Sequence, residues 1–337
     1  MIILGIETSC DETSIAILKD GKEVLTNKIS SQIEIHKEFG GVVPEIASRH
    51  HIKNIAAILE EALEEAQVRM EDIDYIAVTY APGLIGALLV GVSFAKGLSY
   101  GHNIPIIPVH HIKAHIYANF IESDITLPCI ALVVSGGHTN IVYIDEKHNF
   151  KNIGSTLDDA VGESYDKIAR VMGIGYPGGP IVDKMYYQGN KDFLKITEPR
   201  VSGYDFSFSG IKTAVINFVN KSKMKGEEFK KEDLAASFQW KAVDILCKKT
   251  LKATEDLNVK RVIIAGGVAA NSLLRSELVE RGKNVGVEVS YPKMVYCTDN
   301  AAMIAMAAYY KLETRGKEAF AKLDLNGIAT LDISEDI

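Results

Sequence analysis

The sequence predicts an α/β protein of two similar lobes, each a mixed β-sheet flanked by helices. Two observations lead to this fold class. A strand meander followed by helix–strand–helix units begins near residue 2, and the same order of elements restarts near residue 130. The chain has 337 residues, 47% of them hydrophobic, which is enough for two domains that each bury a core. The repeat is one of architecture, because no obvious repeat of sequence accompanies it.

The first half of the chain alternates strand and helix patterns. Short alternating runs predict strands, Asp20-Gly21 predicts a hairpin turn, and a longer run has the apolar period of an amphipathic helix. In order, the expected elements are strands at residues 2–6, 14–18 and 23–30, a helix at 43–66, a strand at 75–79, a small-residue helix at 86–99 and a strand at 106–109.

The second half repeats this order after a new apolar strand. A Gly-Gly turn divides the first two strands, and Pro177-Gly-Gly-Pro180 interrupts a mainly helical stretch. The expected elements are strands at residues 130–135 and 140–145, helices over most of 154–240, a strand at 261–264, a helix opening near Asn271, a strand at 288–291 and a helix at 301–312.

These elements suggest a division into lobes. We expect residues 1–108 with about 313–337 to form the N-terminal lobe. Residues 109–312 are expected to form the C-terminal lobe, with a helical insertion at about 154–240. Two such lobes normally leave a cleft, where ligands tend to bind.

Composition excludes several classes of protein. The net charge of −7 argues against nucleic-acid binding through overall charge, although residues 221–231 could form a local basic patch or, more simply, a solvated loop. No stretch is long enough to span a bilayer, and the N-terminus lacks the features of a signal peptide. The four cysteines are scattered and form no CxxC pair, which fits a reducing cytoplasm.

A histidine pair is the most informative local feature. If residues 108–115 are helical, His111 and His115 project from one face and can share a metal ion. Two imidazoles and one carboxylate are typical of reactive iron(II) sites, and zinc uses similar ligands. The simpler alternative is a pair of solvated surface histidines. His110 adds no geometric support, because adjacent residues face different ways.

Three tight turns could bind an anion. Gly5-Ile-Glu-Thr-Ser9 lies in the first hairpin, Ser135-Gly-Gly-His138 in the second, and Gly266-Gly267 between a strand and a helix. Such turns expose backbone N–H groups, and a helix N-terminus adds a positive dipole end. Each could equally be only a turn. Together and in this order they resemble the actin/Hsp70/sugar-kinase superfamily, which has duplicated RNase H-like domains.

Ordered motifs run through nearly the whole chain. They are Gly5-Ile-Glu-Thr-Ser-Cys-Asp-Glu-Thr13, Gly40-Gly-Val-Val-Pro-Glu-Ile-Ala-Ser-Arg49, Pro82-Gly-Leu-Ile-Gly86, His111-x-x-x-His115, Ser135-Gly-Gly-His-Thr139, Pro177-Gly-Gly-Pro180, Phe206-Ser-Phe-Ser-Gly-Ile-Lys212 and Gly266-Gly-Val-Ala-Ala-Asn271. The chain thereby resembles the bacterial form of the TsaD family. These are tRNA N6-adenosine threonylcarbamoyltransferases, formerly labelled O-sialoglycoprotein endopeptidases.

The resemblance implies specific site residues. His111, His115 and Asp299 match the metal ligands of the family, which is reported with iron(II), with zinc(II) as an alternative occupant. The positions that match contacts to the acyl-adenylate are Val134, Ser135, Gly136, Gly137, His138, Asp166, Gly179, Asp183 and Asn271. The plain alternatives are a solvated helix face at Asp166, a helix break at Gly179 and an N-cap at Asn271.

Asp11 and Glu12 are candidate catalytic carboxylates in the first turn. They could position water on the metal, orient the substrate or cap the adjacent backbone, and the sequence leaves these roles open.

The implied reaction transfers a threonylcarbamoyl group from its AMP anhydride to N6 of adenosine 37 in tRNAs that read codons beginning with A. The implied partners are tRNA, threonylcarbamoyl-AMP, a shorter paralogue of the TsaB type and a small P-loop ATPase of the TsaE type, in the cytoplasm and without a membrane. The small-residue helix, with Gly86 and Gly91, could contact the paralogue or simply pack internally.

Three rival functions remain open from the sequence. A kinase or ATPase of the same superfamily would bind Mg²⁺ through phosphates and needs no histidine pair. A metalloprotease would need the HExxH glutamate, which HxxxH lacks. A non-catalytic scaffold like the paralogue would lack the metal ligands.

Overall fold

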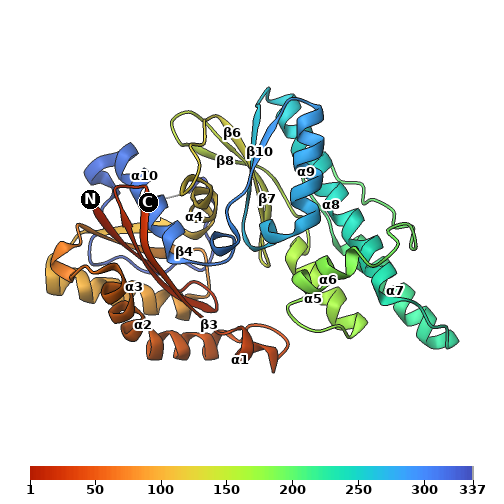
Figure 1. The fold of residues 1–337 in the computed structure, drawn as a ribbon, viewed down its shortest axis with the longest axis horizontal. Coiled ribbons are helices and arrows are strands. Elements are labelled where there is room, and N and C mark those ends of the chain that lie inside the picture. The colour runs from red at the N-terminus through yellow and green to blue at the C-terminus, as the bar shows by residue number, and fades with distance from the viewer. Residues whose placement is uncertain (336–337) are drawn as a thin grey trace. The chain divides into compact units, whose positions relative to one another are not determined.

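The protein forms two compact units in a computed structural model that describes residues 1–335 (Figure 1). Unit 1 comprises Met1–Ile125 and Pro292–Ile337, and unit 2 comprises Thr126–Tyr291. These bounds differ from the lobes expected at residues 108 and 312. Residues 109–125 and 292–312 belong with unit 1, because the helices at 111–117 and 301–315 pack against each other and on the first sheet. The two histidines and Asp299 therefore lie in unit 1.

Unit 1 contains a five-stranded mixed sheet in the order β3-β2-β1-β4-β5. Its strands are β1 (Ile2–Glu7), β2 (Glu12–Lys19), β3 (Glu23–Ser31), β4 (Tyr75–Ala81) and β5 (Ile106–His110). The first three form an antiparallel meander, and β4 and β5 continue the sheet parallel to β1. The turn between β2 and β3 contains Asp20 and Gly21, whose φ angles of 52° and 64° are those of a tight hairpin turn. The carboxyl ends of β1, β4 and β5 consequently lie at one edge.

The helices of unit 1 are α1 (Ile33–Lys37), α2 (Pro44–Ala66), α3 (Ile85–His102), α4 (His111–Tyr117) and α10 (Ala301–Arg315). Helices α2 and α3 pack against each other and on the sheet, whereas α10 contacts every strand of the sheet and α4. In Figure 1 the blue helix α10 lies on the other side of the red strands from α2 and α3. Gly5 permits this approach because it has no side chain, and a Cβ at this position would overlap the carbonyl oxygen of Ala301.

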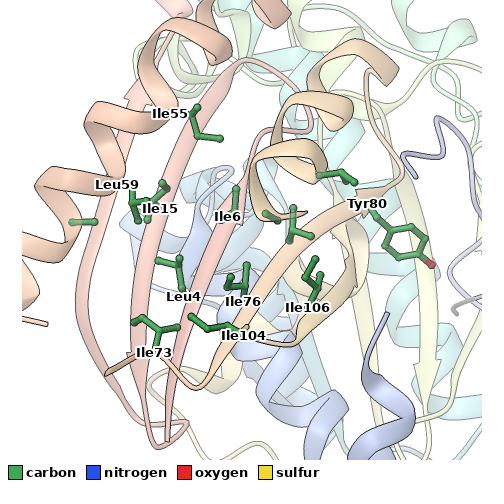
Figure 2. Packing of buried hydrophobic residues seen from close by; sticks show 14 of the residues in the cluster. Leu4, Ile6, Ile15, Ile55, Leu59, Ile73, Ile76, Tyr80, Ile104 and Ile106 are labelled. Atoms are coloured by element: carbon green, nitrogen blue, oxygen red, sulfur yellow. The ribbon is translucent and has the colours of Figure 1, made fainter. Parts of the chain in front are cut away.

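The core of unit 1 lies between the sheet and helices α2 and α3 (Figure 2). Figure 2 shows Leu4, Ile6 and Ile76 from the strands beside Ile55 and Leu59 from α2. Each of these side chains is at most 7% exposed. Full burial of an Ile or Leu side chain contributes about 1.5–3 kcal/mol, so this layer fixes the sheet that carries the site.

Unit 2 repeats the topology with different strands. Its sheet order is β10-β9-β6-β7-β8. Listed from the opposite edge, this order corresponds strand by strand to that of unit 1, with β6 in the place of β1. The strands are β6 (Cys129–Val134), β7 (Thr139–Ile144), β8 (Phe150–Ser155), β9 (Arg261–Ala265) and β10 (Glu288–Ser290). Again three antiparallel strands are followed by two parallel ones. The helices are α5 (Val161–Met172), α6 (Gly178–Tyr186), α7 (Ser209–Lys225), α8 (Lys231–Asp256) and α9 (Ser272–Asn284).

Short 3₁₀ turns complete the described chain, at Met70–Asp72, Ala118–Phe120, Gly267–Ala270, Met294–Tyr296 and Gly316–Ala319. Within residues 1–335, no helix has both the length and the hydropathy needed to cross a bilayer.

The expected element order agrees with the structure apart from three local differences. The short helix α1 and the strand β8 lie where no element was expected. Residues 187–208 form no helix, although 154–240 was expected to be mainly helical, and α8 continues well past residue 240. Residues 221–225 are the exposed end of α7 rather than a loop.

The small residues of α3 serve internal packing. Ala87, Gly91 and Ala95 are buried, and the hydroxyl of Thr8 donates a 2.9 Å hydrogen bond to the carbonyl oxygen of Ala87. A Cβ on Gly91 would overlap the Thr8 hydroxyl, whereas a Cβ on Gly97 in the same helix would meet nothing. This face of α3 is therefore occupied within unit 1.

The Gly91→Ala variant is expected to be destabilised by about 1–3 kcal/mol, because its methyl group displaces the stiff Thr8 side chain and its hydrogen bond. Gly97→Ala is the matched control and should be neutral or stabilising by up to about 1 kcal/mol. Thermal unfolding of both variants measures this. Equal melting temperatures for the two would contradict the packing described for α3.

Candidate functional site

The histidine pair lies on a short buried helix. Helix α4 begins directly after β5, and both His111 and His115 are less than 10% exposed. Their ring centroids are 4.6 Å apart with an interplanar angle of 83°. His110 has a different role, because its Nδ1 accepts a 3.2 Å hydrogen bond from the backbone N–H of Ile112 and caps the helix. The i, i+4 spacing thus places two imidazoles side by side inside the unit.

Asp299 completes a compact donor group. It precedes the N-cap Asn300 of α10, and α10 packs against α4. Its Oδ1 lies 3.1 Å from Nε2 of His115 and 3.5 Å from Nε2 of His111. One ligand atom from each of the three residues lies within 4.8 Å of the others, a spacing that could hold a metal ion.

Glu7 lies behind His111 on the side away from Asp299. It is the last residue of β1 and is fully buried. Its Oε2 lies 3.1 Å from Nδ1 of His111 and accepts a 2.6 Å hydrogen bond from the hydroxyl of Thr79 near the end of β4. The hydroxyl of Ser9 also lies 3.1 Å from that Nδ1, and the Ser9 N–H donates to Oε1 of Glu7. Carboxylate–histidine contacts of this kind orient metal ligands in many proteins.

The electrostatics of the group favour a cation. Burial lowers the pKa of His111, but the charges of Asp299 and Glu7 outweigh it and raise this pKa to about 9. Burial raises the pKa of Glu7, but the charge and hydrogen bond of His111 outweigh it, so this pKa lies below its usual value. Nδ1 of His115 is buried and has no hydrogen-bond partner among residues 1–335. Two imidazoles and a carboxylate, with buried negative charge behind them, fit iron(II) or zinc(II).

The two candidate carboxylates of the first turn are also buried. Asp11 and Glu12 are 9% and 8% exposed, and Oε1 of Glu12 accepts a 3.0 Å hydrogen bond from the hydroxyl of Ser31. Burial and the charges of Asp299 and Asp11 raise the pKa of Glu12 to about 10. Burial and the same two aspartates raise the pKa of the Cys10 thiol. Cys10 is therefore a poor nucleophile, since thiolate is the reactive form.

In unit 2, two of the glycine turns lie side by side. The Ser135–His138 turn is closed by a 2.8 Å hydrogen bond from Ser135 N–H to the His138 carbonyl oxygen, and Gly136 and Gly137 are exposed. Gly266, with φ of 90°, lies so close to the end of β6 that a Cβ on it would be 2.5 Å from the carbonyl oxygen of Val134. This contact follows from the parallel pairing of β6 with β9, which brings both carboxyl ends together. The exposed Ser135–His138 turn could bind a phosphate through backbone N–H groups.

A polar network joins two of the other predicted contacts. Asn271 is the N-cap of α9, and its Oδ1 accepts a 2.9 Å hydrogen bond from Leu274 N–H. Gln239, fully buried in α8, donates to Asp183 at 2.8 Å and accepts from the amide of Asn271 at 3.1 Å. Asp183 also accepts from Ser272 N–H at 3.0 Å. The network holds the N-terminus of α9 beside α6 and α8.

Gly179 lies at the start of α6, and the carboxylate of Asp166 contacts the same turn. Asp166, in α5, accepts a 2.7 Å hydrogen bond from Gly178 N–H, and burial raises its pKa. A Cβ on Gly179 would meet nothing, so this position is open. The local role of Asp166 is thus to cap α6 rather than to form a solvated helix face.

The structure assembles the predicted residues into two groups. Unit 1 holds the metal ligands with Asp11 and Glu12, and unit 2 holds all the predicted adenylate contacts. Sequence reasoning missed Glu7, Thr79 and Gln239. Glu7 ends one strand and Thr79 lies near the end of its neighbour, so a correct strand order could have indicated them. Gln239 could have been noticed as a polar residue within an apolar helical run.

Solved structures first identify the fold class. The chain matches full-length HypF in a phosphate- and nucleotide-bound form with a TM-score of 0.61 and 16% identity, over 93% of this chain and 56% of HypF. It also matches component A of the (R)-2-hydroxyglutaryl-CoA dehydratase of Acidaminococcus fermentans, with a TM-score of 0.54 and 18% identity, over 92% and 96% of the two chains. These likenesses confirm the two-lobed actin/Hsp70/sugar-kinase-like α/β fold.

Sequence comparison then identifies the family. The family model described as TsaD, tRNA N6-adenosine threonylcarbamoyltransferase, matches residues 23–306. A protein of that name from Fusobacterium nucleatum is 72% identical over 100% of this chain and 99% of its own. Another, from Caldicellulosiruptor saccharolyticus, is 55% identical over 93% of each chain. The chain belongs to the TsaD family and is a transferase, as the sequence motifs predicted.

Removing the imidazoles is expected to abolish metal binding. After incubation with iron(II) or zinc(II) and dialysis, His111→Ala and His115→Ala should retain little metal, whereas His102→Ala, at the exposed end of α3, should retain as much as the unmodified chain. Because a proton on His111 competes with the ion, and the pKa of His111 is raised, binding should strengthen as the pH rises from about 6 to 8. Metal analysis measures both effects. Full metal content in both alanine variants would exclude this site.

Proposed function

We propose that the chain transfers the threonylcarbamoyl group from threonylcarbamoyl-AMP to N6 of adenosine 37 in tRNAs that read codons beginning with A. The observation that carries this proposal is the match to tRNA N6-adenosine threonylcarbamoyltransferases over the full length of the chain. The His111–His115–Asp299 group supports it, because a kinase or a scaffold of the same fold has no need of such a donor set.

The reaction forms a bond between N6 of the adenosine and the carbamoyl carbon. The bond from that carbon to the phosphate oxygen breaks, AMP leaves, and N6 loses one proton. The exocyclic amine of adenine is a weak nucleophile, so holding the two reactants in position must supply much of the acceleration. No covalent enzyme intermediate is proposed, because Cys10 is held as a thiol.

We propose iron(II) as the metal of the site, with zinc(II) as the alternative. His111, His115 and Asp299 would hold it, and its chemistry there is to polarise the acyl oxygen as a Lewis acid. Asp11 and Glu12 are the proposed catalytic carboxylates near the substrate.

Unit 2 supplies the proposed adenylate contacts. The exposed turn of Ser135, Gly136, Gly137 and His138 would bind the phosphate through backbone N–H groups, next to Val134 at the end of β6. Gly179 leaves room for a ligand at the start of α6. Asp183 and Asn271, already held by Gln239, would contact the nucleoside without a large loss of side-chain freedom.

The tRNA contact is proposed for unit 2 because of its charge. Unit 2 contains 23 of the 37 lysines and arginines and 20 of the 44 acidic residues, a net charge of +3. Unit 1 therefore has a net charge of −10. Phosphate backbones bind basic surfaces, so the difference between the units favours unit 2 for tRNA despite the negative total.

The proposed setting is a cytoplasmic assembly. We propose a shorter paralogue of the TsaB type and a small P-loop ATPase of the TsaE type as partners. Ile52 on α2 and Ile85 and Leu89 on α3 are large apolar side chains with exposed fractions of 65%, 49% and 39%. They lie on two helices that pack together, which supports a partner contact on this part of unit 1.

The activity test is a reconstituted reaction. The chain, its proposed partners, tRNA, threonylcarbamoyl-AMP and ATP should yield threonylcarbamoyladenosine, detected by mass spectrometry of digested tRNA. His115→Ala and added chelator should each lower product at least about tenfold, because the variant loses a metal ligand and the chelator removes the ion. His102→Ala should leave the yield unchanged. ATP hydrolysis by the isolated chain without modified nucleoside would instead favour the kinase or ATPase alternative.

The partner contact is tested by surface charge. Ile85→Glu together with Leu89→Glu should prevent co-elution with the paralogue in size-exclusion chromatography, because a buried carboxylate in an apolar interface is costly. Met224→Glu, at a side chain 89% exposed on α7, is the matched control and should leave the complex intact. An unchanged complex with the double variant would place the contact elsewhere.

A further inference from the structure

Glu7 is the buried carboxylate closest to the metal ligands that the proposed reaction does not use. It is 0% exposed, so its charge requires compensation from within the protein. Its contacts use both oxygens: Oε1 accepts the Ser9 N–H, and Oε2 accepts the Thr79 hydroxyl at 2.6 Å and faces Nδ1 of His111 at 3.1 Å. A carboxylate held from several directions cannot easily turn away from the imidazole.

We propose that Glu7 is a positioning residue that fixes the ring and the tautomer of His111. A neutral imidazole carries one N–H, and a carboxylate at Nδ1 retains it there. Nε2 is then unprotonated and faces Oδ1 of Asp299 at 3.5 Å, on the side where the donor atoms converge. Glu7 thus acts through His111 and selects Nε2 as the nitrogen that binds metal.

The topology of the sheet builds this arrangement. Strands β1, β4 and β5 are parallel neighbours, and Glu7 ends β1, Thr79 lies near the end of β4, and His111 directly follows β5. Each residue of the relay from Thr79 to Glu7 to His111 therefore lies at the same sheet edge. Their side chains are aligned by backbone pairing and not by a mobile loop.

The two histidine ligands are held differently. Nδ1 of His115 is buried without a hydrogen-bond partner among the described residues, whereas Nδ1 of His111 has both Glu7 and Ser9 within 3.1 Å. A change at Glu7 should therefore affect His111 alone. This difference gives the proposal a signature that general damage to the fold would not produce.

The test compares Glu7→Gln with the unmodified chain. Glutamine keeps the shape and a carbonyl acceptor but removes the charge, so zinc(II) and cobalt(II) affinity should fall about 10- to 100-fold with unchanged stoichiometry. Glu71→Gln, at an exposed carboxylate of unit 1, is the control and should bind normally. In cobalt(II)-loaded protein, the visible d–d bands should shift for Glu7→Gln and not for Glu71→Gln.

Nitrogen-15 NMR of the histidines provides a direct readout. In the zinc-loaded chain His111 should carry its proton on Nδ1, and Glu7→Gln should weaken the protection of that proton while leaving the His115 signals unchanged. A proton on Nε2 of His111 in the zinc-loaded unmodified chain would overturn the proposal. So would unchanged affinity and cobalt bands in Glu7→Gln.

Folding and the metal proposal are checked separately. If Glu7→Gln unfolds, Thr79→Val provides a second test, because it removes only the hydroxyl that holds Glu7. This variant should weaken metal binding to a smaller extent. Unchanged metal affinity in folded Thr79→Val counts against the relay. The inference rests on the proposed metal centre. Failure of the unmodified chain to bind either ion would refute the proposed metal centre. Equal binding by the unmodified chain and Glu7→Gln would refute only the role of Glu7.

Discussion

The close approach of α10 to β1 is the contact on which the candidate metal site depends. Gly5 lies against the carbonyl oxygen of Ala301, and no other residue could occupy position 5 without moving one of the two backbones. Ala301 N–H also donates a 2.9 Å hydrogen bond to the hydroxyl of Ser14 on β2. The chain returns from unit 2 at Pro292 and is fixed at this point of the first sheet. Asp299, two residues earlier, is thereby delivered to the histidines of α4.

A second constraint is the number of carboxyl groups buried near this contact. Glu7, Asp11 and Glu12 are each at most 9% exposed. Burial and the charges of neighbouring carboxylates raise the pKa of Glu12. Burying several carboxylates together is unfavourable unless a cation offsets them. His111 in its protonated form offsets part of this charge, and a divalent ion would offset more. The nearby carboxylates also explain why the pKa of His111 is raised, although burial alone would lower it.

The sequence was informative wherever a feature is local. The i, i+4 spacing of His111 and His115, the Asp20-Gly21 turn and the N-cap at Asn271 depend only on neighbouring residues, and the structure shows each of these geometries. Strand β8 was missed because Lys151 and Asn152 interrupt any alternation, and α1 is only five residues long. The adenylate roles in unit 2 remain predictions.

What could not be predicted depends on contacts between distant segments. The compact units divide the chain at other residues than the expected lobes, because nothing in residues 292–312 alone indicates that α10 packs on the first sheet. Glu7 reads as the end of a strand beside a polar loop, and its contact with His111 follows only from the strand order β1-β4-β5. Asp299 could be named as a ligand only through the family resemblance, since a lone aspartate before a helix usually has a capping role.

The duplicated topology places opposite chemistry at equivalent positions. By sheet order, β1 and β4 of unit 1 correspond to β6 and β9 of unit 2. In unit 1 buried polar side chains, Glu7 and Thr79, lie at or near the ends of these strands and favour a cation. In unit 2 the corresponding strands lead to Val134 and to Gly266, where backbone turns lie together and favour an anion. One fold thus offers a candidate cation site and a candidate anion site by changing the residues at two strand ends, which suits the proposed reaction with its metal and phosphate leaving group.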